Sequence, residues 1–310
     1  MSDNSTPTGV YIKLVVVALL WGGAFIAGRI VSAELNAPTA ALWRYLVATA
    51  ALLALAFAIE HGLPRLTIRQ WLGVLVLGTL GVAVTNLCFM YGLQTVSAAR
   101  ASLIFALIPA ATLLGGRWFL HEPLTGARIL GIATALLGVA VELGGGNPLA
   151  LFGGRVGWGE AALFGCVLAW SAYTLRSKRL LGEGVSSLAA TTFAALAGTV
   201  LLAAASAATG NLAFPHASLR VWLAIGFLGL FSTALAYVWF FDGVRILGPA
   251  RTAVFINLVP VVAIGLSVLI LHETLELSMV IGAVLVVSGV FIINRAPAVV
   301  AVRRAPAHPV

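Results

Sequence analysis

Residues 71–142 of this chain read WLGVLVLGTLGVAVTNLCFMYGLQTVSAARASLIFALIPAATLLGGRWFLHEPLTGARILGIATALLGVAVE, and the same pattern returns later in the chain. Shifted by 151 positions, the stretch aligns without a gap with residues 222–293, and 18 of the 72 pairs are identical. The identical pairs include Pro109 with Pro260 and Arg100 with Arg251. Identities scattered at one fixed offset indicate a duplicated fold unit rather than shared composition.

The composition is typical of an integral membrane protein. Hydrophobic residues make up 61% of the chain and charged residues 9%, and the mean hydropathy is +1.07. Ten apolar runs are long enough to cross a hydrocarbon core of about 30 Å. They cover residues 12–32, 39–59, 70–91, 97–119, 125–143, 157–175, 186–209, 219–241, 249–271 and 276–294. We therefore predict an all-α integral membrane protein with ten transmembrane helices.

The longest connection between spans, residues 144–156, divides the chain into two units of five spans. We predict an N-terminal tail at 1–11, a first five-helix repeat at 12–143, a second repeat at 157–294 and a C-terminal tail at 295–310. The apolar run after Lys13 is followed by further spans, so we interpret it as a retained first helix and not as a signal peptide.

The distribution of lysine and arginine predicts the orientation in the membrane. If the N-terminus is cytoplasmic, thirteen basic residues lie on the cytoplasmic side and five on the other side. The thirteen are Lys13, Arg65, Arg69, Arg117, Arg128, Arg176, Lys178, Arg179, Arg245, Arg251, Arg295, Arg303 and Arg304, and the five are Arg29, Arg44, Arg100, Arg155 and Arg220. Both termini are therefore predicted to be cytoplasmic. Because five spans is an odd number, the second repeat must be inverted, and two inverted repeats can act as inner and outer gates of a midplane site.

Several classes of site are disfavoured by the sequence. The net charge is +8, but the basic residues lie between apolar segments and set the topology, which argues against nucleic-acid binding. Cys88 and Cys166 lie within apolar segments and have no metal or redox spacing, so we predict neither a disulfide nor a metal site. No phosphate-binding GxxxxGK[ST] motif is present, which argues against pumping driven by ATP. No cofactor is predicted.

Several motifs together resemble a known family. They are Leu20-Trp21-Gly22-Gly23-Ala24-Phe25, Leu42-Trp43-Arg44-Tyr45, GLQTVSAARAS at 92–102, Pro109, and HEPLT at 121–125. With the repeat, they resemble the EamA branch of the drug/metabolite transporter superfamily over about residues 12–294. Within that branch the chain is similar to bacterial exporters of aromatic and neutral amino acids. The resemblance implies ten helices, with spans 1, 3, 4, 6, 8 and 9 lining a central cavity.

Two pairs of residues at equivalent positions are candidates for the transport pathway. Pro109 and Pro260 lie near the middle of their spans, where proline frees a carbonyl that must face protein, water or a ligand. We predict kinks beside the pathway, and the alternative is a fixed kink used only for packing. Trp21 and Trp170 also lie within their spans, beside small residues. We predict that both line the cavity rather than only pack in the core.

The remaining candidates are polar or aromatic residues at the same depth. Asn86 corresponds to Tyr237 by the repeat, Met90 corresponds to Phe241, and Asn257 precedes Pro260 by three residues. Each residue alone could serve only to hold helices together. As a set they predict an amphipathic cavity suited to an amino acid with an apolar side chain. The predicted cavity residues are Trp21, Phe25, Asn86, Met90, Ser102, Phe105, Trp170, Thr174, Tyr237, Phe241 and Asn257.

The charged residues are interpreted mainly as interfacial. Arg44 is predicted to have a gating or structural partner, and carboxylate binding is its secondary interpretation. The seventh span carries no arginine at the matching position, so a role shared by both halves is not expected. His121-Glu122 and His272-Glu273 lack the second histidine of a zinc motif and are predicted to form capped turns at the N-terminal ends of spans 5 and 10. The acids at span ends, predicted to be solvated, are Glu142, Glu160 and Asp242.

These observations predict a secondary transporter, and not an enzyme, that exports neutral or aromatic amino acids by alternating access. A nucleoside, a sugar or a drug is the alternative cargo. A membrane-embedded enzyme would need clustered carboxylates or histidines within the spans, and a sensor or assembly partner would need larger loops. The predicted partners are a small-molecule substrate and the bilayer of a bacterial inner membrane. A monomer is compatible with this prediction.

Overall fold

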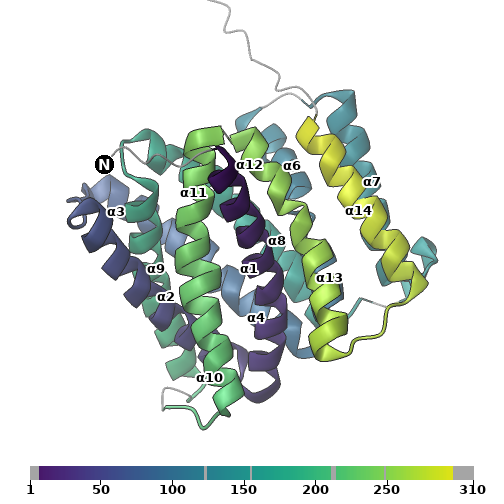
Figure 1. Cartoon of the computed structure of the whole chain (residues 1–310), viewed down its shortest axis with the longest axis horizontal. Coiled ribbons are helices and arrows are strands. Elements are labelled where there is room, and N and C mark those ends of the chain that lie inside the picture. Colours follow the sequence, from purple (N-terminus) through teal and green to yellow (C-terminus); the bar gives the residue numbers. More distant parts are fainter. Residues whose placement is uncertain (1–6, 122–123, 154–155, 211–213, 248, 296–310) are drawn as a thin grey trace, which may run out of the picture.

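The computed structural model describes residues 7–121, 124–153, 156–210, 214–247 and 249–295, and in these residues it contains helices and no strand (Figure 1). The first half comprises α1 (Pro7–Glu34), α2 (Ala37–Glu60), α3 (Ile68–Leu77), η1 (Gly78–Val84), α4 (Thr85–Thr95), α5 (Ala98–Phe105), α6 (Ile108–Leu120), α7 (Gly126–Leu143) and η2 (Pro148–Gly153). The second half comprises α8 (Trp158–Gly182), α9 (Ser187–Ala208), α10 (Leu219–Gly226), η3 (Phe227–Leu235), α11 (Ala236–Leu247), α12 (Pro249–Ile256), α13 (Leu258–Leu271) and α14 (Leu277–Arg295).

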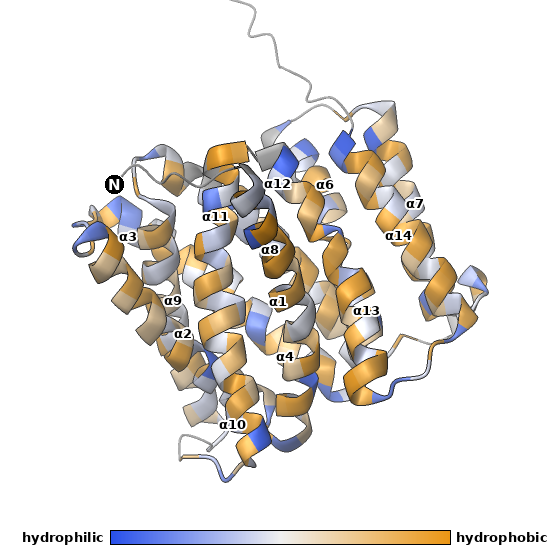
Figure 2. Ribbon diagram, viewed as in Figure 1, coloured by the Kyte–Doolittle hydropathy of each residue, from blue (hydrophilic) through white to orange (hydrophobic). Residues whose placement is uncertain are grey.

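The helices form a bundle with two ends, and each half crosses it five times. We call the end where α1 begins the Pro7 face and the end where α1 finishes the Glu34 face. Hydrophobic residues dominate the length of the helices, and hydrophilic residues gather toward the two ends (Figure 2). A helical bundle with an apolar girth satisfies its backbone internally, as crossing a bilayer requires. The protein is therefore a multi-pass membrane protein.

Nine helical segments among the described residues are long and apolar enough to cross a membrane. The remaining predicted span, residues 157–175, corresponds to α8, which has 25 residues but a lower mean hydropathy. The charged residues Glu160, Arg176, Lys178 and Arg179 lower that hydropathy most. The difference from the predicted count of ten thus comes from the charged residues near the two ends of one span.

The second repeat runs opposite to the first. In Figure 1, the segment from α10 to α11 starts at the Glu34 face, whereas its counterpart from α3 to α4 ends there. The packing of α7 against α14 displays the same relation in detail. A Cβ atom on Gly131 would lie 2.7 Å from the carbonyl oxygen of Gly289, and one on Gly138 would lie 2.7 Å from that of Gly282. Gly131 thus meets Gly289, the repeat counterpart of Gly138, and Gly138 meets Gly282, the repeat counterpart of Gly131. These repeated glycines permit a close antiparallel crossing of the two helices.

A π-helical turn interrupts the third span of each half at the same place. It comprises η1 in the first half, and η3, which begins two residues earlier, in the second. The hydroxyl of Thr85 donates to the carbonyl of Leu80 at 2.7 Å, and that of Thr233 donates to the carbonyl of Leu228 at 2.8 Å. Both bonds reach back five residues, which is the spacing of a π-helix. Single π-helical turns often occur at functional sites.

The repeated histidines end helices. His121 and His272 follow α6 and α13 with φ of 55° and 54°, so each is a left-handed C-cap. No group of metal-ligating side chains occurs among the residues that the structure describes. Glu122 lies outside those residues. The prediction for Glu273 is wrong, because its carboxylate does not lie at the start of α14 and instead accepts from the backbone N–H groups of Ala98 and Ala99, at 2.9 and 3.2 Å.

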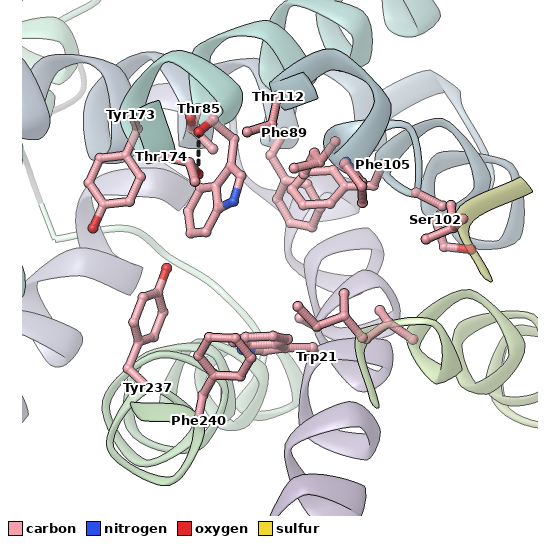
Figure 3. Close-up of a pocket in the computed structure, with 18 of the residues that line it drawn as sticks. Trp21, Thr85, Phe89, Ser102, Phe105, Thr112, Tyr173, Thr174, Tyr237 and Phe240 are labelled. Carbon is pink, nitrogen blue, oxygen red and sulfur yellow. Dashed lines mark hydrogen bonds between the residues drawn. The ribbon is translucent and has the colours of Figure 1, made fainter. Parts of the chain in front are cut away.

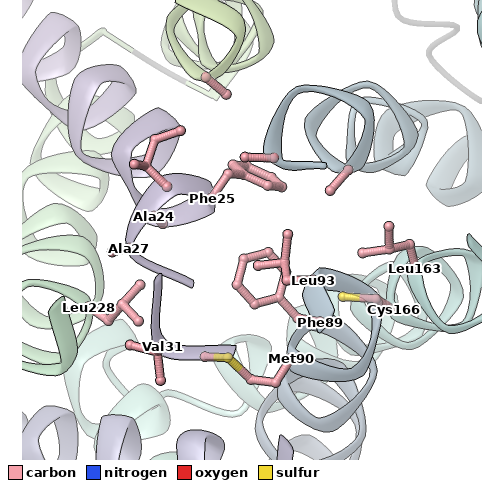
Figure 4. Packing of buried hydrophobic residues seen from close by; sticks show 14 of the residues in the cluster. Ala24, Phe25, Ala27, Val31, Phe89, Met90, Leu93, Leu163, Cys166 and Leu228 are labelled. Carbon is pink, nitrogen blue, oxygen red and sulfur yellow. The ribbon is translucent and has the colours of Figure 1, made fainter. Parts of the chain in front are cut away.

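Buried side chains from α1, α4 and α8 form the centre of the apolar core (Figure 4). Phe25 and Val31 of α1 pack toward Phe89 and Leu93 of α4, and Leu163 of α8 closes the far side. Because α8 comes from the second half, this core joins the two repeats. The space next to this core holds the candidate site.

Candidate functional site

A cavity of about 660 Å³ lies between the two repeats. It is lined from all ten crossings, with most of its side chains from α1, the segments α3–α4, α5–α6, α8, α10–α11 and α12–α13. Its size is within the range of about 300–1,000 Å³ that is usual for small-molecule sites. Figure 3 shows the aromatic rings that surround it.

The cavity is lined by thirteen of the fourteen residues that the sequence predicts as cavity, kink, or gating or structural residues. They are Trp21, Phe25, Arg44, Asn86, Ser102, Phe105, Pro109, Trp170, Thr174, Tyr237, Phe241, Asn257 and Pro260. Lining a cavity is a matter of position only, and their part in binding a substrate remains a prediction.

Met90 is the exception, since it does not line the cavity. Its side chain has no exposed surface and extends toward Val31 of α1 (Figure 4). The hydroxyl of Ser32 donates to its carbonyl at 3.2 Å, and the sulfur lies 3.6 Å from the same hydroxyl. Phe241, the repeat counterpart of Met90, lines the cavity, whereas Met90 packs in the core. The prediction that Met90 lines the cavity is wrong.

Six aromatic side chains, which we call the aromatic cluster, surround the middle of the cavity: Trp21, Trp170, Tyr173, Tyr237, Phe240 and Phe241. The ring centroids of Trp21 and Trp170 lie 6.1 and 6.3 Å from that of Tyr237, both edge to face. The hydroxyls of Tyr173 and Tyr237 point toward the same space (Figure 3). The indole N–H of Trp21 donates to the carbonyl of Ser232 at 3.1 Å, which fixes the ring. The cluster offers an apolar site with two polar tips.

Three phenylalanines, which we call the phenylalanine cluster, form the end of the cavity toward the Glu34 face: Phe25, Phe89 and Phe105. Their centroids are 5.4 to 6.0 Å apart and all three pairs are edge to face. This geometry stabilises aromatic pairs beyond the area that they bury. The cluster separates the cavity from the Glu34 face.

The predicted polar residues bond mainly within their own helices. Asn86 donates to the carbonyl of Val82 at 2.8 Å, Ser102 to that of Ala99 at 2.7 Å, and Thr174 to that of Trp170 at 2.9 Å. Asn257 accepts from the side-chain amide of Asn294 at 3.3 Å, while its own amide nitrogen is buried with no partner among the described residues. The first three side chains are thus partly satisfied, whereas Asn257 keeps a donor free.

Both prolines lie just after breaks in their helices. The helix ends at Phe105 and resumes at Ile108 before Pro109, and it ends at Ile256 and resumes at Leu258 before Pro260. Since proline cannot donate to the preceding turn, a break at this point is its expected effect. Phe105 and Ile108 beside the first break, and Ile256 and Asn257 at the second, line the cavity.

Several residues that line the cavity were not predicted from the sequence, namely Tyr45, Phe89, Thr112, Arg128, Tyr173, Ser232, Phe240 and Asn294. The internal repeat contains a pattern that indicates two of them. Phe89 and Phe240 are identical partners in the repeat, and they lie three residues after Asn86 and Tyr237. Tyr173 lies three residues after Trp170, hence about one helical turn away on the same face.

The cavity reaches the Pro7 face but not the Glu34 face. Leu181 near the end of α8, Ser187 at the start of α9 and Asn294 near the end of α14 line it, and all three lie at the Pro7 face. Toward the Glu34 face, the lining stops at Phe25, Phe89 and Ser102.

Polar contacts between the repeats close the Glu34 face. Glu273, between α13 and α14, binds the N-terminus of α5 through the two N–H bonds given above, in the geometry that favours an anion. Glu34 at the end of α1 accepts from the hydroxyl and the backbone N–H of Ser218, at 2.7 and 2.8 Å. Within the first repeat, the guanidinium of Arg29 also donates to the carbonyl of Leu93 on α4 at this face.

A charged group at the same face also differs from the prediction. Arg100 contacts Glu142 at 2.7 Å and Glu160 at 3.3 Å, and we call these three residues the Arg100 cluster. Only 1% of Glu142 and 8% of Glu160 is exposed, so the prediction of solvated end positions is wrong for both. Asp242 lies 3.7 Å from Lys13 and is partly exposed.

Comparisons with known proteins agree with this architecture. The sequence profile of the EamA-like transporter family matches residues 8–143 and 157–295. The chain is 29% identical to the uncharacterized transporter YyaM of Bacillus subtilis, over 91% of this chain and 92% of the relative. It is 28% identical to a probable terminal-alkyne amino-acid exporter of Streptantibioticus cattleyicolor, over 91% and 92%.

A crystal structure of another protein supports the fold alone. It is 22% identical in sequence, superposes with a TM-score of 0.65, and the match covers 92% of this chain and 96% of that chain. The family match spans both repeats, and the relatives are named as transporters rather than enzymes. The chain belongs to the EamA-like transporter family.

Proposed function

We propose that this transporter exports neutral or aromatic amino acids across a bacterial inner membrane by alternating access. The observation that carries the proposal is a cavity with an aromatic cluster that reaches the Pro7 face and is closed at the Glu34 face. An apolar cavity with a few polar groups suits a small molecule with an apolar side chain. The similarity to a probable amino-acid exporter supports the same class of cargo.

The proposed direction of export follows from the orientation that lysine and arginine favour. The Pro7 face carries most of the basic residues, which supports its placement on the cytoplasmic side. The conformation described here is then inward-facing and accessible to a cytoplasmic substrate. Release on the other side requires the contacts at the Glu34 face to break and the repeats to exchange roles, as inverted repeats allow.

The size of the cavity favours a second candidate. A volume of about 660 Å³ also accommodates a nucleoside or a sugar. The aromatic rings that suit an aromatic amino acid would stack equally well on a base.

Counterflow in proteoliposomes tests the proposal. Vesicles loaded with unlabelled substrate are diluted into labelled L-phenylalanine, L-tryptophan, L-leucine, uridine or glucose, with and without a pH gradient. We expect labelled amino acids to accumulate above the level of protein-free vesicles. Accumulation of uridine or glucose alone would identify the alternative cargo, and no amino-acid accumulation by folded protein in verified orientation would refute amino-acid export.

A further inference from the structure

Arg44 is a cation without an anionic partner in the cavity. Its guanidinium lies 5.7 Å from the ring centre of Phe89 and 5.8 Å from that of Tyr45. Its one direct bond in the described structure is a long one, from Nη2 to the hydroxyl of Thr233 at 3.4 Å. The Nε atom is buried with no partner, and none of the ion pairs between described residues includes Arg44.

An unpaired cation at this depth is energetically costly. Ionisable residues inside membrane spans usually pair with one another or line a pathway for a charged substrate. The contacts with Phe89 and Thr233 hold the guanidinium in position but neutralise none of its charge. Arg44 lines the cavity, so its unpaired charge lies beside the space where a substrate would lie.

Four other residues that line the cavity each carry a buried polar atom without a partner, and each of these atoms is a donor or a hydroxyl. Besides Arg44 Nε, they are Arg128 Nε, Asn257 Nδ2, Thr112 Oγ1 and Ser232 Oγ. Three of these five atoms can only donate a hydrogen bond. No aspartate or glutamate lines the cavity in the part of the chain that the structure describes. Arg44 and Arg128 thus give the lining positive charge with no carboxylate to balance it, and the complement of this lining is a group with acceptors and negative charge.

We propose that Arg44 binds the carboxylate of the transported substrate. Guanidinium and carboxylate form two parallel hydrogen bonds, and this pair is strongest where water is excluded. Ser232 precedes Thr233, the present partner of Arg44, and its free hydroxyl supplies a further donor nearby in the chain. The aromatic cluster then takes the apolar part of the substrate. This inference rests on the proposed function and specifies its substrate as an organic carboxylate.

The test is calorimetric titration of the purified protein with four probes. L-Phenylalanine and 3-phenylpropionate carry a carboxylate, whereas L-phenylalaninamide and 2-phenylethylamine carry none. We expect the two carboxylates to bind and the other two probes to bind at least about tenfold more weakly. Arg44→Gln should remove this preference, and Arg44→Lys, which keeps the charge but not the paired donors, should retain part of it.

A matched control is Arg117→Gln, which removes the same charge from an exposed position of α6 outside the cavity and should leave all four affinities unchanged. If wild-type protein binds the amide as tightly as the acid, the carboxylate site is refuted while amino-acid binding stands. If 3-phenylpropionate binds through Arg44 but L-phenylalanine neither binds nor is transported, the carboxylate site stands and amino-acid export fails. Binding of none of the probes refutes both. The wild-type comparison decides the matter even if Arg44→Gln does not fold.

Discussion

Arg100→Ala is expected to destabilise the protein by about 3–5 kcal/mol, because it leaves a buried carboxylate without its cation. Glu142 is 1% exposed, and Arg100 is its one partner in the described structure. Its second oxygen already lacks a hydrogen bond. Glu160 would remain as a second negative charge in the same group. Thermal unfolding in detergent, followed by intrinsic fluorescence, measures the loss as a lower midpoint.

Two further variants separate this cause from a general effect of losing an arginine. Arg117→Ala removes an exposed arginine from the same span and should leave the midpoint unchanged. Arg100→Met combined with Glu142→Leu and Glu160→Gln removes all three charges of the cluster and should recover most of the stability, since uncharged residues can replace a buried ionic group. An Arg100→Ala protein that unfolds at the wild-type midpoint would show that the cluster does not stabilise the fold.

Trp21→Ala and Trp170→Ala are each expected to reduce transport strongly. Each substitution removes a large ring from the aromatic cluster, and truncation of a buried ring costs about 2 kcal/mol of binding, or about thirtyfold in affinity. Trp21 also bonds the carbonyl of Ser232 in the π-helical segment, so its loss releases that segment as well. Initial rates of counterflow over a range of substrate concentrations measure the effect.

Trp118→Ala is the matched control for both variants. Trp118 is 81% exposed on α6 and lies outside the cavity, so its truncation removes an indole without touching the site. We expect wild-type transport from this control. If the two cavity variants transport as well as Trp118→Ala, with all three proteins folded, the assignment of the aromatic cluster to the substrate is wrong.

The repeat in the sequence predicted the fold because the matching residues have fixed roles in both halves. Gly131 and Gly138 reappear as Gly282 and Gly289 since the α7–α14 crossing needs no side chain at those points. The position of Trp21 beside small residues likewise predicted its place at the cavity. Such features follow from local sequence and the helical period.

Features that depend on partners far apart in the chain were not predictable. Glu273 bonds Ala98, 175 positions away, and no local pattern distinguishes that contact from a cap on the next helix. The acids of the Arg100 cluster lie near span ends, where solvation is the usual outcome, and only the packing of α5, α7 and α8 buries them. The prediction for Met90 was wrong for a related reason. The repeat identifies the equivalent position in the other half, but it does not show which neighbouring side chains surround Met90.

Alternating access of the cavity to the two faces requires the contact between Glu273 and the start of α5 to open. This contact joins the α5–α6 and α12–α13 segments, both of which line the cavity. Ser97→Cys with Glu273→Cys, in a Cys88→Ala/Cys166→Ala background, permits a short reducible thiol crosslinker to hold the two sides together. Each single cysteine variant, treated in the same way, controls for modification alone.

Counterflow of the crosslinked double variant, before and after reduction, is the most direct measurement. Alternating access predicts that crosslinking lowers transport to the level of protein-free vesicles and that reduction restores it. Transport by the fully crosslinked protein at the rate of the reduced protein would contradict the account, because substrate would then cross while the Glu34 face stayed closed.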